Sequence, residues 1–224
     1  MLIFWQARLV LLSVPKTGTT ALEAAFGPHA DAAIHNPPGL KHMGVAKWRD
    51  ALAPTFEQRG KRPLETMAVM REPVDWLGSW WRYRARPQLD GHRNSTRDVD
   101  FPAFVEAWLS DAPPPFAQVG SQARFLRGGV DHLFRYDRLE EAVALLARRT
   151  GQAPALERRN VSPARDAVLP EDLRERMRAE RAEEFALWDD LAGRGGASGR
   201  QGPDASPDEG PGGGGSSGGA GPRG

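Results

Sequence analysis

The sequence of 224 residues contains no cysteine, so neither disulfide bonds nor thiolate chemistry can contribute to its stability or its reactions. It also lacks a surplus of either charge, because 30 Lys and Arg residues are balanced by 29 Asp and Glu residues. This balance argues against a nucleic-acid-binding protein that depends on a broad positive field. The short spacing of metal ligands is missing too: His29, Asp31, His35 and His42 are spread irregularly, and we expect no bound metal.

Large hydrophobic residues are absent from the last 32 residues, Gly193 to Gly224, which contain 14 of the 25 glycines. Such a segment cannot bury enough apolar surface to offset the conformational entropy of the chain. We therefore predict one folded domain over residues 1–192 and a disordered, glycine-rich tail over residues 193–224. The first part is long enough for a single α/β domain with a sizeable core.

Long apolar runs are also scarce, and no stretch of the sequence is suited to span a bilayer. The segment Met1 to Val14 is apolar but is interrupted by Gln6 and Arg8, and it has no cleavage site of small residues. We expect it to enter the fold as a first strand rather than to act as a signal peptide or an anchor.

The most informative feature that the sequence does contain is the segment SVPKTGTT at residues 13–20. It follows the apolar run Leu9–Leu12 and precedes the amphipathic run Ala21–Phe26, so it predicts a strand, a tight turn and a helix start. The first turn of a helix leaves backbone N–H groups unpaired and carries partial positive charge, which favours a bound phosphate or sulfate. Gly18 permits close approach of the backbone, and Lys16 adds a mobile cation.

This loop departs from the P-loop of nucleoside-triphosphate-binding proteins, G-x-x-x-x-G-K-[ST]. The lysine of that motif follows the last glycine, whereas Lys16 precedes Gly18 by two residues. The order P-K-x-G-T-T resembles instead the 5′-phosphosulfate loop of the sulfotransferase family, whose members use 3′-phosphoadenosine 5′-phosphosulfate as donor.

A second motif follows about fifty residues later. The apolar run Thr66–Met70 ends in Arg71-Glu72-Pro73, and Pro73 suits the first position of a helix. Arginine at the tip of a strand offers a planar fork of donors to phosphate oxygens. With Ser79 on the following helix, the stretch resembles the family's 3′-phosphate-binding motif.

The resemblance extends over roughly Leu9 to Leu191, with decreasing specificity. Later segments that resemble family elements, in the same order, are Phe101–Leu109, Gln122–Leu126, His132–Leu139 and Arg159–Ser162. The implied fold is α/β, a P-loop-like three-layer arrangement with a central parallel sheet flanked by helices. The implied function is transfer of a sulfuryl group from 3′-phosphoadenosine 5′-phosphosulfate (PAPS) to a hydroxyl or amine of a small-molecule or carbohydrate acceptor.

The resemblance also implies roles for single residues. Lys16 would neutralise charge on the leaving oxygen and act as a catalytic residue, Arg71 and Ser79 would hold the 3′-phosphate, and Tyr136 would contact the adenine side. The implied donor-binding residues are Lys16, Thr17, Gly18, Thr19, Thr20, Arg71, Ser79 and Tyr136. Arg158 and Arg159 are further candidates, to close over the nucleotide.

A hydroxyl acceptor benefits from a general base, and His42 is the candidate for this catalytic role. The run from Lys41 to Arg49 resembles a K-H-x-x-x-x-x-x-R segment of bacterial and carbohydrate-type sulfotransferases. A histidine between a loop rich in proline and glycine and a helix can be poised near neutral pH. His35 and Glu23, which follows the anion loop, remain the alternatives.

Periodicity and breaker residues predict alternating strands and helices, hence a parallel sheet covered on both faces with its ligands beyond the carboxyl ends of the strands. The predicted strands are Leu9–Val14, Thr66–Met70 and His132–Tyr136, with a possible one near Ala32–His35. The predicted helices are Thr19–Phe26, Met43–Ala53, Val74–Arg84, Phe101–Leu109, Gly120–Leu126, Leu139–Thr150 and Pro170–Leu191. Lys16, Arg71 and Tyr136 all lie at or just past such strand ends.

Two other functions stay open at this point. A nucleotide kinase would need the G-K-[ST] order and an acidic strand end for magnesium, where the chain has Arg71. A catalytically inactive nucleotide-binding or interaction module could use the same scaffold. Relatives in the secretory pathway are usually membrane-anchored, so for a chain without an anchor we expect a cytoplasmic location, with neither nucleic acid nor membrane as a partner.

Overall fold

The computed structural model describes residues 1–156 and 165–193. The predicted tail therefore lies outside the described residues, apart from Gly193, which ends the last helix. The strands are β1 (Leu2–Phe4), β2 (Leu9–Leu11), β3 (Ala32–Ala33), β4 (Glu65–Met70) and β5 (His132–Arg135). The α-helices are α1 (Thr19–Phe26), α2 (Pro38–Lys41), α3 (Val45–Lys47), α4 (Ala53–Phe56), α5 (Pro73–Arg84), α6 (Phe101–Leu109), α7 (Gln122–Phe125), α8 (Leu139–Thr150), α9 (Glu171–Glu180) and α10 (Ala182–Gly193). Short helical turns are η1 (Gly27–His29), η2 (Trp48–Leu52), η3 (Pro87–Leu89), η4 (Pro115–Ala117) and η5 (Tyr136–Arg138).

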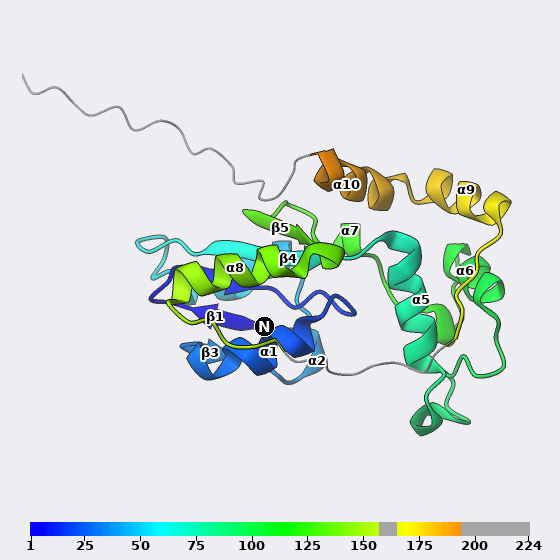
Figure 1. Ribbon diagram of the computed structural model, residues 1–224, viewed down its shortest axis with the longest axis horizontal. Helices are drawn as coiled ribbons and strands as arrows, with labels where there is room; N and C mark the ends of the chain where they lie inside the picture. Colours follow the sequence, from blue (N-terminus) through cyan, green and yellow to red (C-terminus); the bar gives the residue numbers. More distant parts are fainter. Residues whose placement is uncertain (157–164, 194–224) are drawn as a thin grey trace, which may run out of the picture.

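The five strands form one mixed sheet in the order β3-β1-β2-β4-β5 (Figure 1). Strands β2, β4 and β5 are parallel to one another, whereas β1 is antiparallel to both of its neighbours. The α/β class is thus confirmed, but the expectation of a parallel sheet holds only for β2, β4 and β5.

The reversed strand β1 has a simple cause. Only four residues, Trp5 to Arg8, separate it from β2, and a parallel crossover needs a dozen or more. Arg8 has a positive φ of 54° in this turn. The apolar segment Met1–Val14, predicted as a first strand, is therefore a hairpin, and β2 is shorter than the predicted strand Leu9–Val14.

Helices cover both faces of this sheet, which makes three layers. Alternate residues of β1, β2, β4 and β5 pack against α1 and α8 on one face, through Leu22, Phe26 and Leu146 among others. The other face packs against the segment from α3 to α4 and against α10, through Trp48, Trp188 and Leu191. This alternation follows from the period-2 geometry of strands that are buried on both sides.

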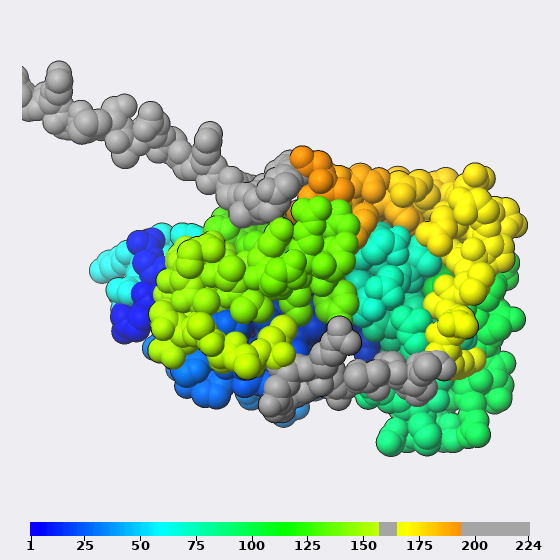
Figure 2. All heavy atoms as spheres, in the orientation of Figure 1, coloured from blue at the N-terminus to red at the C-terminus, as the bar shows by residue number. Residues whose placement is uncertain are grey.

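A second hydrophobic cluster lies beyond the carboxyl ends of the parallel strands. It joins α5, α6, α9 and the start of α10, and its members include Leu77, Trp81, Phe104, Met177 and Phe185. Strand β4 leads directly into α5, so α5 stands where the sheet meets this cluster (Figure 1). In Figure 2, α9 and α10, coloured yellow to orange, lie along the blue-green α5.

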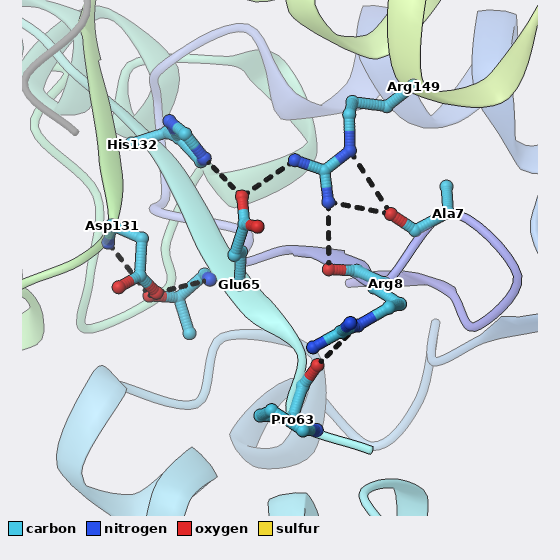
Figure 3. Close-up of polar contacts among 8 residues, drawn as sticks. Ala7, Arg8, Pro63, Glu65, Asp131, His132 and Arg149 are labelled. Atoms are coloured by element: carbon cyan, nitrogen blue, oxygen red, sulfur yellow. Dashed lines mark hydrogen bonds and ion pairs between the residues drawn. The ribbon is translucent and has the colours of Figure 1, made fainter. Parts of the chain in front are cut away.

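The amino ends of β4 and β5 are held by a polar network at the opposite edge (Figure 3). Glu65 Oε2 accepts hydrogen bonds from His132 Nε2 at 2.6 Å and from Arg149 Nη1 at 2.7 Å. Arg149 also donates to the carbonyls of Ala7 and Arg8, so the network ties α8 to the turn of the hairpin.

Most predicted elements are present with altered ends. Helices α6 and α8 have the predicted bounds, α5 begins one residue earlier at Pro73, and α7 is shorter than the predicted Gly120–Leu126. Strand β5 ends at Arg135, one residue before the predicted Tyr136, which begins η5. The possible strand near Ala32–His35 is the two-residue β3.

Two predicted helices are wrong as continuous α-helices. The helix Met43–Ala53 is interrupted by the π-helical turn η2, and α4 carries the winding on to Phe56. The helix Pro170–Leu191 is two helices, because Arg181 leaves the helical region with φ −127° and ψ 43°. Arg181 Nη2 donates to the Leu109 carbonyl at 3.0 Å, a bond that holds the break against the end of α6. Among the described residues, none of the helices combines the length and the hydrophobicity needed to cross a membrane.

Candidate functional site

The loop between β2 and α1 is tied down from inside and from the side. Thr17 Oγ1 donates to the Val14 carbonyl at 2.9 Å, and Trp76 Nε1, from α5, donates to the Pro15 carbonyl at 2.8 Å. Lys16 and Gly18 both have a positive φ, of 68° and 78°. These contacts hold a tight turn whose course is set before any ligand binds.

Gly18 is the N-cap of α1, and no side chain caps this helix. The N–H groups at its start therefore face the loop with their partial positive charge uncompensated by a capping oxygen. The Tyr136 ring packs against this corner: a Cβ at Gly18 would lie 3.0 Å from Tyr136 Cε2. Only glycine combines this backbone conformation with such close approach of the ring.

Arg71 brings the second motif to the same place. Its Nη1 donates to the Lys16 carbonyl at 3.3 Å, and its guanidinium carbon lies 4.4 Å from the centroid of the Tyr136 ring. Its Nε forms an ion pair with Asp75 Oδ2 at 2.5 Å. Lys16, Arg71 and Tyr136, predicted at the carboxyl ends of three strands, therefore meet at one edge of the sheet.

The ammonium group of Lys16 lies along α5 rather than in open solvent. Its Nζ is 4.0 Å from the centroid of the Tyr83 ring and 5.7 Å from that of Trp80, both cation–π distances. Burial, first of all, and the positive charges of Arg86, Arg71 and Arg82, in that order, together lower the pKa of Lys16 to about 8. The Lys16 amine is thus partly desolvated within a cluster of cations, an environment that favours a bound anion.

The hydroxyl residues of the motifs differ in their positions. The Thr17 hydroxyl is fully buried and already engaged, so it supports the loop from within, and only its backbone N–H remains a candidate for contact with a ligand. Thr19 is buried at the start of α1, whereas Thr20 is exposed. Ser79 is buried on α5, on the helix that carries Trp80 and Tyr83.

His42 adjoins the beginning of the anion loop. Its Nδ1 lies 2.7 Å from the Ser13 carbonyl, which can only accept, so Nδ1 carries the proton. Burial lowers the pKa of His42, and a hydrogen bond to the Ser13 carbonyl partly opposes this effect. The neutral ring therefore keeps Nε2 as its acceptor nitrogen, the arrangement that a general base needs.

Glu23, an alternative base, is occupied. Its carboxylate accepts from Ser13 Oγ at 2.8 Å, from Lys41 Nζ at 2.7 Å and from the Met1 ammonium at 2.9 Å. Burial raises the pKa of Glu23, but these donors outweigh it and hold the pKa below its ordinary value. A carboxylate so stabilised is a poor proton acceptor, and its contacts hold Ser13, whose carbonyl meets His42, and Lys41, which precedes His42 in the chain.

His35, the other alternative, is more than half exposed and lies 3.9 Å from Glu23. Arg158, Arg159 and the segment Asn160–Ser162 lie outside the described residues. Within residues 1–156 and 165–193, no group of three or more His, Cys, Asp or Glu side chains is placed to hold a metal ion.

Two residues of the site were not predicted in these roles. Tyr83 approaches the loop from α5, and the side-chain amide of Gln122 contacts the Arg71 backbone. The helical spacing of Trp76, Trp80 and Tyr83 was the available signal for an aromatic lining of the site. Gln122 had been noted only as part of a family-like element.

Comparisons with known proteins identify no relative of this chain. Scans against models of known families, curated proteins and solved structures each found no match.

Proposed function

We propose that this chain is a sulfotransferase that moves a sulfuryl group from PAPS to a hydroxyl or amine of a small-molecule or carbohydrate acceptor. The observation that carries the proposal is the contact between the two motifs: Arg71 Nη1 lies 3.3 Å from the Lys16 carbonyl. Two segments separated by about fifty residues thus form one cationic surface, as gripping both ends of a single nucleotide requires.

The residues present fit such a donor. The start of α1 has no side-chain cap, so its N–H groups are available to anionic oxygens. Lys16 and Arg71 add charge, and the Tyr136 ring beside Gly18 offers a flat surface to a base. When bound, the donor supplies the sulfuryl group and a second anionic group, its 3′-phosphate.

The chain's own residues then have distinct tasks. The Lys16 ammonium neutralises negative charge that develops at the leaving oxygen, which requires the protonated form. Arg71 and Ser79 fix the register of the nucleotide along α5. His42 Nε2 receives the proton that the acceptor hydroxyl loses, because its Nδ1–H is held by the Ser13 carbonyl. By analogy with phosphoryl transfer, positioning and charge neutralisation supply most of the catalysis.

Binding of adenosine 3′,5′-bisphosphate tests the donor site without an acceptor. In calorimetry we expect the wild type to bind, and Lys16→Ala and Arg71→Ala each to weaken binding about tenfold or more, since charged hydrogen bonds contribute roughly 1.5–3 kcal/mol. Arg97→Ala is the matched control, because Arg97 is exposed and pairs with Asp90 rather than with a residue of the loop. A wild type that ignores the nucleotide would refute the proposal.

An acceptor screen with sulfur-labelled donor tests the transfer itself. Nucleotide binding with no turnover of any acceptor would instead favour an inactive binding module. Magnesium-dependent turnover of ATP would favour the kinase, although Arg71 occupies the strand end where a kinase places an acidic residue for the metal.

The proposal includes a cytoplasmic location. It is supported by the apolar segment of residues 1–14, whose strands β1 and β2 are buried within the sheet. Fractionation of cells that express the full chain tests it, and recovery of the protein in a membrane or secreted fraction would contradict it.

A further inference from the structure

Two cations share one aromatic ring at the far end of α5. Lys16 Nζ lies 4.0 Å and the Arg86 guanidinium carbon 4.6 Å from the centroid of the Tyr83 ring. Trp80 packs edge-on against the same ring, with 5.9 Å between centroids. The ring is about one-third exposed, so this cluster borders solvent.

The cations near this ring differ in whether a carboxylate neutralises them. Arg71 and Arg82 both pair with Asp75, at 2.5 Å and 3.4 Å. Throughout residues 1–156 and 165–193, no ion pair joins Lys16 or Arg86 to a carboxylate. Bringing two like charges to one ring costs electrostatic free energy, and a bound anion would offset that cost.

Arg86 is too far along α5 to belong to the 3′-phosphate motif. Arg71 precedes the first residue of α5, and Arg86 follows its last residue, Arg84; the helix between them is about 18 Å long at 1.5 Å per residue. Lys16 spans part of this length, since its backbone contacts Arg71 and its ammonium group reaches Tyr83. Arg86 therefore approaches the Lys16 side chain at the Tyr83 ring, whereas Arg71 contacts the Lys16 backbone.

Building on the proposed function, we propose that Arg86 and Tyr83 form an anion subsite for the acceptor, next to Lys16. The acceptor accordingly carries an anionic oxygen group, a carboxylate or a phosphate, in addition to the hydroxyl that is modified. The planar guanidinium group matches two such oxygens, and the Tyr83 ring packs against that guanidinium. Such an acceptor also brings negative charge to Arg86, which no carboxylate of the described residues neutralises.

Matched pairs of probes test the subsite by binding rather than by turnover. The carboxylate pair is 4-nitrophenyl β-D-glucuronide and 4-nitrophenyl β-D-glucoside, and the phosphate pair is glucose 6-phosphate and glucose. Titrated against the full chain saturated with adenosine 3′,5′-bisphosphate, at least one anionic probe binds about tenfold or more tightly than its neutral partner. Equal binding within both pairs, or no binding of any anionic probe, overturns the proposal.

Variants assign the preference to one side chain. Arg86→Ala removes the difference within the pair, Arg86→Lys keeps part of it, and Arg97→Ala leaves it unchanged. A preference that survives in Arg86→Ala also overturns the subsite.

Donor binding separates this proposal from the function on which it rests. At pH 7 Lys16 is protonated with or without the Arg86 charge, so Arg86→Ala should bind adenosine 3′,5′-bisphosphate and PAPS as the wild type does when acceptor is absent. A loss as large as that of Arg71→Ala would assign Arg86 to the donor and overturn the subsite. Failure of the wild type to bind either nucleotide would refute the sulfotransferase proposal itself.

Discussion

The side-chain amide of Gln122 holds both backbone polar groups of Arg71. Gln122 Oε1 accepts from the Arg71 N–H and its Nε2 donates to the Arg71 carbonyl, each at 2.9 Å. The amide acts like one more residue of a neighbouring strand, just where β4 ends and sheet pairing stops. Gln122 is fully buried, so no water replaces it, and the backbone at Arg71, where the proposed 3′-phosphate motif begins, depends on this pair of bonds.

Replacing this amide tests the relationship. Gln122→Leu leaves two backbone groups without a partner, and we expect a loss of roughly 2–4 kcal/mol in the free energy of unfolding. Gln118→Leu is the control, because the Gln118 side chain is exposed and donates only to the Pro113 carbonyl. Urea denaturation measures both, and equal losses would contradict the role given to Gln122.

Gly18 gives a second prediction. Gly18→Ala combines a positive φ with a Cβ at 3.0 Å from the Tyr136 ring, so we expect a loss of roughly 1–3 kcal/mol together with weaker nucleotide binding. Gly60→Ala isolates the backbone effect, since Gly60 has φ 85° with open space around it. If both variants are equally stable and bind the nucleotide equally, the close approach at Gly18 has no consequence.

The lowered pKa of Lys16 predicts how nucleotide binding depends on pH. With a pKa of about 8, Lys16 is protonated at pH 7 and neutral above pH 9, so affinity for adenosine 3′,5′-bisphosphate falls as pH rises, by at most tenfold per unit. Lys16→Arg keeps its charge and should flatten this profile in calorimetry across pH 6.5–9.5. Profiles of equal slope would remove Lys16 from the binding site.

The lowered pKa of Lys16 also determines how this residue's contribution to folding stability changes with pH. Between the folded pKa of about 8 and the ordinary value of 10.5, the unfolded chain binds more protons at this residue than the folded one. The contribution of Lys16 to stability therefore rises with pH across that window.

His42 is tested by turnover. We expect His42→Ala to lower the rate of transfer by roughly 10²–10⁴ while leaving nucleotide binding unchanged, as is typical for loss of a general base. His35→Ala is the matched control, since that histidine is exposed. Because burial lowers the pKa of His42, the wild-type rate should fall only as pH drops below 6.5. A rate that survives in His42→Ala would exclude it as the base.

The network of Figure 3 predicts acid sensitivity away from the site. Burial raises the pKa of Glu65, but hydrogen bonds from Arg149 and His132 bring it below the ordinary value. The contribution of Glu65 to folding stability is thus present above about pH 5 and is lost as pH falls further. Glu65→Gln should cost about 1 kcal/mol near neutral pH and reduce the acid-side loss in thermal melts, without changing nucleotide binding. The control Glu171→Gln, at an exposed position, should change neither the stability near neutral pH nor the loss of stability in acid.

The sequence predicted those parts of the fold whose signals are local. The bounds of α6 and α8 follow from amphipathic spacing, and the positions of Lys16 and Arg71 at strand ends follow from apolar runs that stop at a turn. What it missed depends on partners distant along the chain. The direction of β1 is decided by the hairpin turn, and the break at Arg181 by carbonyls of α6.

The same distinction applies to the site. Gln122 and Tyr83 act on residues 51 and 67 positions away, as the Gln122–Arg71 bonds and the Tyr83–Lys16 contact show. No local pattern carries that information. The choice among His42, Glu23 and His35 likewise needed the contacts of Glu23, which the sequence leaves open.

The break at Arg181 has one further consequence. Helix α9 belongs to the cluster around α5 and α6, whereas the end of α10 belongs to the core beneath the sheet. Arg181 therefore stands where the chain passes from the cluster around α5 and α6 to the core beneath the sheet. A substitution of Arg181 would thus change how these two clusters are joined while leaving Lys16, Arg71 and His42 themselves unaltered.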